Sequence, residues 1–249
     1  YEDPEIAGQR GYISKGKEHA KGHNVGDLKE FYHIGQIIED GDPIQSEYPD
    51  NIFPNEVPAI EEFGVKLYQS LETSGKALLQ AISEYLDLPV NYFDDKVHKG
   101  NSILRPIHYY GIENPTEVPD GAVRAAEHED INLITLLIGA SAEGLQVLTK
   151  EGNWLGANPE PNQIVIDVGD MLQHLTNHRL KSTTHRVVNP PKERMNEPRY
   201  SMPFFLHPKS NMDLTSLANC ITDEHPKQYE DMTAGEYLNQ RLREIGLKK

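Results

Sequence analysis

The sequence contains only one cysteine among its 249 residues, Cys220. A single cysteine excludes an internal disulfide framework and a cysteine-cluster metal site, and it favours a reducing compartment. No apolar run reaches about 18 residues, so no transmembrane helix is expected. The opening segment YEDPEIAGQR also lacks the basic and apolar regions of a signal peptide. We therefore expect a cytoplasmic protein that has no membrane partner.

Basic residues are also scarce. The chain has 24 Lys and Arg against 39 Asp and Glu, a formal net charge of −15 at pH 7. Such a surface repels phosphate backbones, so we expect no nucleic-acid partner. Because the acids are spread along the chain, ordinary solubility is the simpler explanation of this charge. We expect a small-molecule substrate and a monomer or weak homo-oligomer.

The length and the 37% hydrophobic content suit a single globular domain. Residues 1–55 are rich in Gly, Pro, Asp and His without a sustained period, which predicts ordered loops with short elements. Apolar residues recur at helical spacing in residues 56–88, where Gly75 either divides two helices or is tolerated in one. Near the C-terminal end, Thr233 and Glu236 have the spacing of a capping box that begins a final helix.

Short strands are predicted from about residue 102 onward. Some alternate between polar and apolar residues, others are continuous apolar runs, and turn residues separate them. The segments are SILRPIHYY, INLITLLIG, GLQVLT, WLG, QIVIDVGD, STTHRVVN and RYSMPFFL, with GLQVLT and WLG joined as a hairpin around Glu151 and Gly152. Several short strands at this spacing are typical of an antiparallel barrel or sandwich. The predicted fold class is therefore mainly β with flanking α-helices.

His128 and Asp130 stand two residues apart in AAEHEDINLIT, where an acidic stretch becomes apolar. In an extended segment such residues face the same side, so both side chains can reach one metal ion. His185 in KSTTHRVVN shares a face with Thr183 and Val187, and an antiparallel barrel could bring it to the same ion as a third ligand. The simpler alternatives are a surface strand end for the first pair and a buried core histidine for His185.

Two imidazoles and a carboxylate occupy one face of a metal and leave the opposite face open, as in non-haem Fe(II) oxygenases. A structural zinc site would instead fill all four positions, usually with cysteines. Arg199 and Ser201 also stand two apart, in RYSMPFFL, and would face one side of a strand. A guanidinium beside a hydroxyl is a receptor for a carboxylate, although Arg199 on its own would favour a solvated strand residue.

Other polar residues have simpler interpretations. His174 and His178 are four apart, but no Glu follows His174, and we expect both in a surface loop. Asp167 and Asp170 flank a turn, where a turn-capping role is expected.

The series His-x-Asp, His and Arg-x-Ser occurs in this order, with GDMLQHLTN before the second histidine and that histidine within KSTTHRV. This pattern resembles the 2-oxoglutarate/Fe(II)-dependent dioxygenases of the isopenicillin N synthase-like branch. The resemblance is close over about residues 102–210. It implies one oxygenase domain over residues 1–249, from which a family N-terminal region is missing. It further implies a loop and helical flank at residues 1–100. A double-stranded β-helix (jelly-roll) core would follow at residues 101–210, and a C-terminal helical tail at residues 211–249.

The same resemblance assigns roles to individual residues. It implies that Fe(II) is bound by His128, Asp130 and His185. It also implies that the distal carboxylate of the co-substrate 2-oxoglutarate is bound by Arg199 and Ser201. Tyr109 stands where such enzymes often carry a tyrosine that also touches the co-substrate.

Candidate walls of the substrate pocket are Arg105, His108 and Phe205, each of which could equally be plain strand packing. His108 stands where plant members of the family have Asn. Arg105 would suggest an anionic substrate if it points inward.

The expected reaction is the oxidation of an unactivated C–H bond of a small molecule, using Fe(II), 2-oxoglutarate and dioxygen and releasing succinate and CO2. Hydroxylation, desaturation and ring closure are all open outcomes, and ascorbate could serve as the reductant. The alternatives are an iron oxidase of the same branch that does not use 2-oxoglutarate, an ethylene-forming enzyme and a non-catalytic jelly-roll binding protein.

Overall fold

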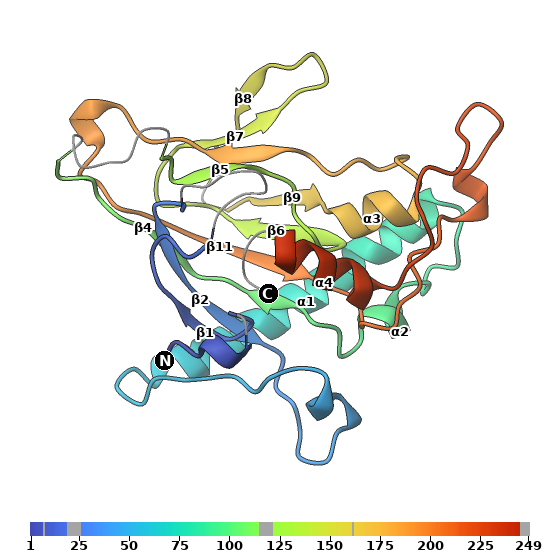
Figure 1. The fold of residues 1–249 in the computed structure, drawn as a ribbon, viewed down its shortest axis with the longest axis horizontal. Coiled ribbons are helices and arrows are strands. Elements are labelled where there is room, and N and C mark those ends of the chain that lie inside the picture. Colours follow the sequence, from blue (N-terminus) through green and yellow to red (C-terminus); the bar gives the residue numbers. More distant parts are fainter. Residues whose placement is uncertain (7, 19–25, 115–121, 161, 245–249) are drawn as a thin grey trace.

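The computed structural model describes residues 1–249 except residues 7, 19–25, 115–121, 161 and 245–249. Two sheets form its centre (Figure 1). The seven-stranded sheet contains β1 (Gly11–Ile13), β2 (Lys29–Gly35), β3 (Ile103–Leu104), β4 (Ile107–Tyr109), β6 (Ile134–Ile138), β9 (Ile164–Val168) and β11 (Arg199–Leu206). The four-stranded sheet contains β5 (Ala125–His128), β7 (Leu145–Leu148), β8 (Trp154–Gly156) and β10 (His185–Val187). Within the described ranges all strand pairs are antiparallel, which confirms the predicted architecture.

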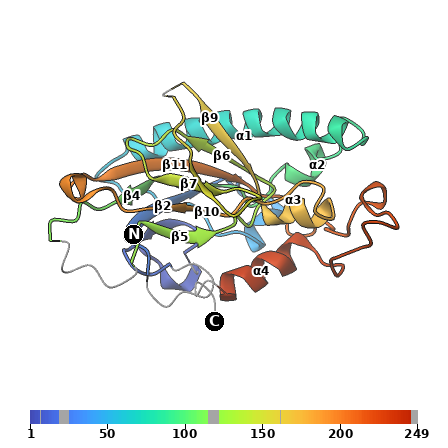
Figure 2. The same ribbon diagram turned by 90° about the horizontal axis from the view of Figure 1, so that it is seen from above.

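Helices flank the sheets. The long helix α1 (Ala59–Tyr85) lies along the outer face of the seven-stranded sheet (Figure 2), where Tyr68 packs edge-on against Phe204 with 5.1 Å between ring centroids. The structure also contains α2 (Asp94–Val97), α3 (Asp170–Leu175), α4 (Ala234–Glu244) and the short 3₁₀ turns η1 (Pro4–Ile6), η2 (Pro43–Ser46), η4 (Lys192–Arg194) and η5 (Ala218–Cys220). In the part of the chain that is described, no helix has the length and apolar character needed to span a bilayer.

Gly75 does not divide α1. It is buried in the middle of this 27-residue helix, and a Cβ atom there would lie 2.8 Å from Cδ2 of Leu206. A glycine therefore lets the helix approach β11 closely, which accounts for a residue that otherwise weakens helices.

The capping box at the start of α4 is confirmed. The backbone N–H of Thr233 donates to Oε2 of Glu236 at 2.7 Å, and the N–H of Glu236 donates to Oγ1 of Thr233 at 3.3 Å. These two bonds satisfy amide groups that have no acceptor inside the helix.

Strand β2 is a major element that the sequence analysis placed within a region of loops. It lies between β1 and the pair β3 and β4, so the large sheet includes residues well before 101. Its inward positions include Lys29, a residue that a simple apolar period does not predict inside a sheet. Lys29 is tolerated there because Glu18 and Asp27 pair with it at 2.9 and 2.8 Å.

Strand β11 contributes side chains to both faces of the large sheet. Side chains alternate along a strand, so Arg199, Ser201 and Phe205 face the inside of the sandwich. Phe204 and Leu206 face α1 on the outside. This alternation decides which polar residues can meet in one cavity.

His174 is not in a surface loop, contrary to the prediction. It belongs to α3, is only 2% exposed, and its Nε2 lies 3.0 Å from the carbonyl oxygen of Glu230. The ring also packs against Tyr229 and Tyr237, because the chain after residue 212 folds back over α3. The ring of His178, which follows α3 in the chain, stacks on the ring of Tyr229.

Candidate metal centre and active site

His128, Asp130 and His185 converge on one point between the two sheets. The register of β5 and β10 places His185 directly opposite His128. Nε2 of His128 and Nε2 of His185 lie 3.9 and 3.8 Å from Oδ1 of Asp130, and one potential ligand atom of each residue lies within 4.8 Å of the others. Fold geometry therefore unites three residues that the sequence separates into two segments.

Each ligand candidate is oriented by a neighbour. Nδ1 of His128 lies 2.7 Å from the carbonyl oxygen of Ala126, and Nδ1 of His185 lies 3.0 Å from that of Thr183. A carbonyl can only accept, so each Nδ1 carries a proton and Nε2 is the nitrogen of each ring that can bind a metal. Such backbone partners are the usual support of metal-bound histidines.

The electrostatics of the cluster favour a cation. Burial, and then the charge of His185, lower the pKa of His128 to about 4, so its imidazole is neutral at pH 7. Burial opposes ionisation of Asp130, but the two imidazoles hold its pKa below the ordinary value. The hydroxyl of Thr135 donates to Oδ2 of Asp130 at 2.5 Å, which leaves Oδ1 for a metal. Burial opposes the charged form of His185, but Asp130 and the carbonyl of Thr183 raise its pKa, so this imidazole attracts positive charge. Two imidazole nitrogens and a carboxylate suit a divalent ion such as Fe(II).

Arg199 faces the same cavity from β11. Its side chain is 2% exposed, and its hydrogen bonds run to the carbonyl oxygen of Ala142 at 3.1 Å and to Oγ of Ser201 at 3.4 Å. Tyr109, directly opposite Arg199 on β4, places its ring 4.9 Å from the guanidinium carbon. No carboxylate of the described residues forms an ion pair with this buried guanidinium, so its surroundings suit an anionic ligand.

Comparisons with known proteins agree with this geometry. Residues 101–208 match the 2OG-Fe(II) oxygenase superfamily. The chain is 32% identical to proline hydroxylase buaE of Petromyces alliaceus, and the alignment covers 96% of this chain and 76% of that protein. The chain belongs to the 2OG-Fe(II) oxygenase superfamily.

Solved structures of oxygenases support the same assignment. A protein assigned to this family from Caulobacter crescentus has 48% identity and a TM-score of 0.84, with 96% of this chain and 76% of that chain covered. A full-length Neurospora crassa protein solved in complex with alpha-KG has 31% identity and a TM-score of 0.79, with 96% and 77% covered. These findings confirm the predicted jelly-roll fold, the 2-oxoglutarate-dependent dioxygenase activity and its cofactors Fe(II) and 2-oxoglutarate.

The cavity of this oxygenase has a volume of about 280 Å³, and its lining includes Arg105 and Phe205, two of the candidate substrate residues. The guanidinium of Arg105 lies between the rings of Phe31 and Phe205, 4.3 and 4.9 Å from their centroids. Its Nε donates to Nε2 of His33 at 2.6 Å, and its Nη1 lies 3.3 Å from Oε1 of Glu18. The charge of Arg105 therefore already has a partner.

Lys29 also lines the cavity and was missed by the sequence analysis. Its Nζ lies 2.9 Å from the same Oε1 of Glu18 and 2.8 Å from Oδ2 of Asp27. Burial disfavours the ammonium form, but the two carboxylates outweigh it and raise the pKa of Lys29. The signal was the Asp-x-Lys spacing in GDLKE, which places Asp27 and Lys29 on one side of an extended chain.

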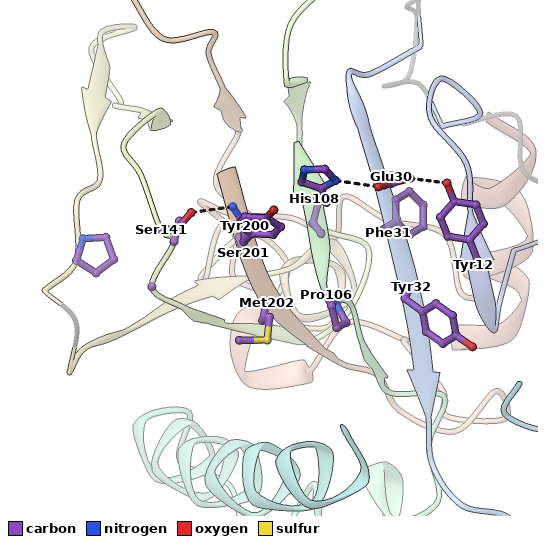
Figure 3. Close-up of a pocket in the computed structure, with 14 residues that line it drawn as sticks. Tyr12, Glu30, Phe31, Tyr32, Pro106, His108, Ser141, Tyr200, Ser201 and Met202 are labelled. Atoms are coloured by element: carbon purple, nitrogen blue, oxygen red, sulfur yellow. Dashed lines mark hydrogen bonds and ion pairs between the residues drawn. The ribbon is translucent and has the colours of Figure 1, made fainter. Parts of the chain in front are cut away.

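The prediction that His108 lines this cavity is wrong. Neighbouring residues of a strand face opposite sides of the sheet. Because the side chain of Tyr109 faces the inner cavity, that of His108 faces the outer side. Figure 3 shows His108 on the outer face, stacked on Tyr200 with ring centroids 4.8 Å apart and bonded to Glu30 at 2.8 Å. These residues line a separate outer cavity of about 600 Å³. Although the outer cavity is larger, the candidate metal-binding cluster found among the described residues lies in the inner one.

Asp167 faces the inner cavity as well, so the expected turn-capping role does not describe it. It lies opposite Thr135 in the register of β9 and β6, and its Oδ2 is 3.4 Å from Nδ1 of His185. Burial raises the pKa of Asp167 to about 6 against the opposing effect of His185. Asp170, by contrast, accepts a bond from the hydroxyl of Tyr237 at 2.9 Å and anchors α4.

Proposed function

We propose that His128, Asp130 and His185 bind Fe(II) and that Arg199 and Ser201 bind the distal carboxylate of 2-oxoglutarate. The observation that carries this proposal is the buried guanidinium of Arg199, which faces the cavity of the three ligand candidates without a carboxylate partner among the described residues. A buried charge is costly unless it is paired, and the co-substrate dianion would supply the pair.

The other residues of the chain orient and shield the reactants. Tyr109 packs under the guanidinium and keeps it directed across the cavity. Ser201 adds a hydroxyl donor beside it, so the bound carboxylate meets two donors in fixed positions. Apolar side chains such as Leu137, Val147 and Val187 line the rest of the cavity and limit the access of water.

When bound, iron and 2-oxoglutarate supply the oxidising chemistry, in which an unactivated C–H bond is oxidised and succinate and CO2 are released. The comparisons do not favour the oxidase alternative, because the similar Neurospora crassa protein was solved in complex with alpha-KG. We further propose that residues 1–249 act as one domain, because β2 is shared by the large sheet with strands from the second half of the chain. Cytoplasmic location and a monomer or weak homo-oligomer stay predictions.

The nature of the primary substrate follows from the partners of Arg105. Because Glu18 already neutralises this guanidinium, we propose that Arg105 interacts with the substrate through its flat surface and spare N–H groups. A small molecule that accepts a hydrogen bond fits this wall better than one that depends on a negative charge.

The test is an anaerobic titration of the metal-free protein with Fe(II) and then with 2-oxoglutarate. The visible charge-transfer band of the chelate reports both binding events. We expect the band in the wild type, a much higher 2-oxoglutarate requirement in Arg199→Ala, and wild-type behaviour in Arg194→Ala, whose exposed guanidinium pairs only with Glu197 in the described structure. Bound iron without any band would contradict the assignment of the co-substrate site.

A further inference from the structure

Asp167 is a carboxylate of the active-site cavity that the proposed function does not use. It projects from β9 toward the inside of the sandwich, next to Thr135 on β6. Its side chain is 22% exposed, and Asp167 is one of the residues that line the cavity. A small molecule in the cavity can therefore reach it.

The basic groups of the cavity are already paired with other anions. Lys29 and Arg105 share Oε1 of Glu18, and Lys29 also pairs with Asp27. Arg199 is assigned to the co-substrate carboxylate. In the ranges that the structure describes, no lysine or arginine forms an ion pair with Asp167.

His185 does not balance this charge either. Its Nδ1 lies closer to the carbonyl oxygen of Thr183, at 3.0 Å, than to Oδ2 of Asp167, at 3.4 Å. The Nδ1 proton is therefore already accepted by the backbone. With Nε2 bound to a metal, the imidazole is neutral and offers Asp167 no full positive charge. The orientation of His185 thus has a sufficient cause that does not involve Asp167.

We propose that Asp167 is a specificity-determining residue that binds a protonated amine of the primary substrate; this inference rests on the proposed function. Asp167 already has neutral hydrogen-bond partners, the side chain of Thr183 and the backbone of Val168. A largely buried carboxylate without a cation is still costly, and an ammonium group would supply the opposite charge. Arg105 and the ring of Phe205 form another part of the same cavity and can contact the carbon skeleton of such an amine. The substrate class is therefore a small amine.

The test is calorimetric binding to the anaerobic Fe(II)–2-oxoglutarate complex of the full chain. The probes are matched pairs that differ in one atom or group: pyrrolidine and tetrahydrofuran, piperidine and tetrahydropyran, benzylamine and benzyl alcohol. We expect each amine to bind at least about tenfold more tightly than its oxygen counterpart. Asp167→Asn should abolish this preference, and Glu127→Gln, which removes an exposed carboxylate next to His128, should preserve it.

Two outcomes would overturn the inference. One is equal binding of both members of each pair, or no amine binding, in wild-type protein that shows the charge-transfer band. The other is an amine preference that persists in Asp167→Asn, since direct coordination of the metal by the amine would behave in this way. Absence of the band in the wild type would instead contradict the proposed function. The wild-type comparison needs no variant, so it stands even if Asp167→Asn fails to fold.

Discussion

His128 and His185 are directly opposed residues of the adjacent antiparallel strands β5 and β10. Their rings lie 4.4 Å apart between centroids, and both direct Nε2 toward Oδ1 of Asp130. The pairing of two short strands therefore sets the geometry of the candidate metal site. Residues that fix either strand or the Asp130 carboxylate should tune metal affinity.

Thr135→Val should weaken Fe(II) binding. The hydroxyl of Thr135 donates to Oδ2 of Asp130 at 2.5 Å, and its loss frees the carboxylate to rotate. Loss of such a supporting bond typically costs about 10–100-fold in metal affinity. Anaerobic Fe(II) titration measures the change, with Thr149→Val in the β7–β8 hairpin as the control. Unchanged affinity would mean that Asp130 is held in place by other contacts.

Ser201→Ala should raise the KM for 2-oxoglutarate and alter the dissociation constant of iron little. A hydrogen bond to a charged group contributes about 1.5–3 kcal/mol, so an increase of at least about tenfold is expected. Steady-state 2-oxoglutarate consumption at saturating Fe(II) measures it. Ser141→Ala is the matched control, because the Ser141 hydroxyl bonds to Tyr200 on the outer side of β11. An equal effect of both variants would argue for a structural role.

Gly75→Val should destabilise the fold. The added side chain would meet Leu206 and Leu136, whose nearest atoms lie 2.8 and 3.4 Å from the position of a Cβ atom. Overpacking of this kind lowers the free energy of unfolding by about 1–3 kcal/mol. Urea denaturation measures the change. Ser74→Val, at an exposed position of the same helix, reports the effect of a β-branched residue alone and should cost far less.

Protonation of His207 should lower the unfolding free energy of the metal-free protein as the pH falls from 7 to 5. Burial lowers the pKa of His207 to about 4, below the ordinary value of 6.5. Between these two values the unfolded chain binds more protons than the folded one, so stability falls as the pH falls. From pH 7 to pH 5 this histidine should remove roughly 2 kcal/mol of unfolding free energy.

Urea denaturation at the two pH values gives this difference in unfolding free energy. His207→Gln should reduce the loss, because the amide does not titrate. His98→Gln, at an exposed position, should leave it unchanged. Equal losses in the wild type and in His207→Gln would show that other groups carry the acid sensitivity.

Much of the architecture is predictable from local patterns. The strand segments after residue 102, the hairpin at Gly152 and the capping box of Thr233 all follow from side-chain period and turn chemistry, which act between near neighbours. The same patterns fail for β2, where Lys29 is buried only because Asp27 and Glu18 neutralise it. They also fail for His174, whose burial depends on a segment that folds back from more than 50 residues away.

The sequence by itself determined the candidate donor set: His128 with Asp130, His185, and Arg199 with Ser201, the residues that the proposed function uses. It also determined the family, because those residues occur in a specific order. The tertiary structure alone decided which residues share the cavity. It placed Tyr109 inside and His108 outside, added Lys29 and Asp167 to the wall, and paired Arg105 with Glu18. The physical reason is that strand register and sheet packing join distant segments, whereas spacing along the chain reports only local geometry.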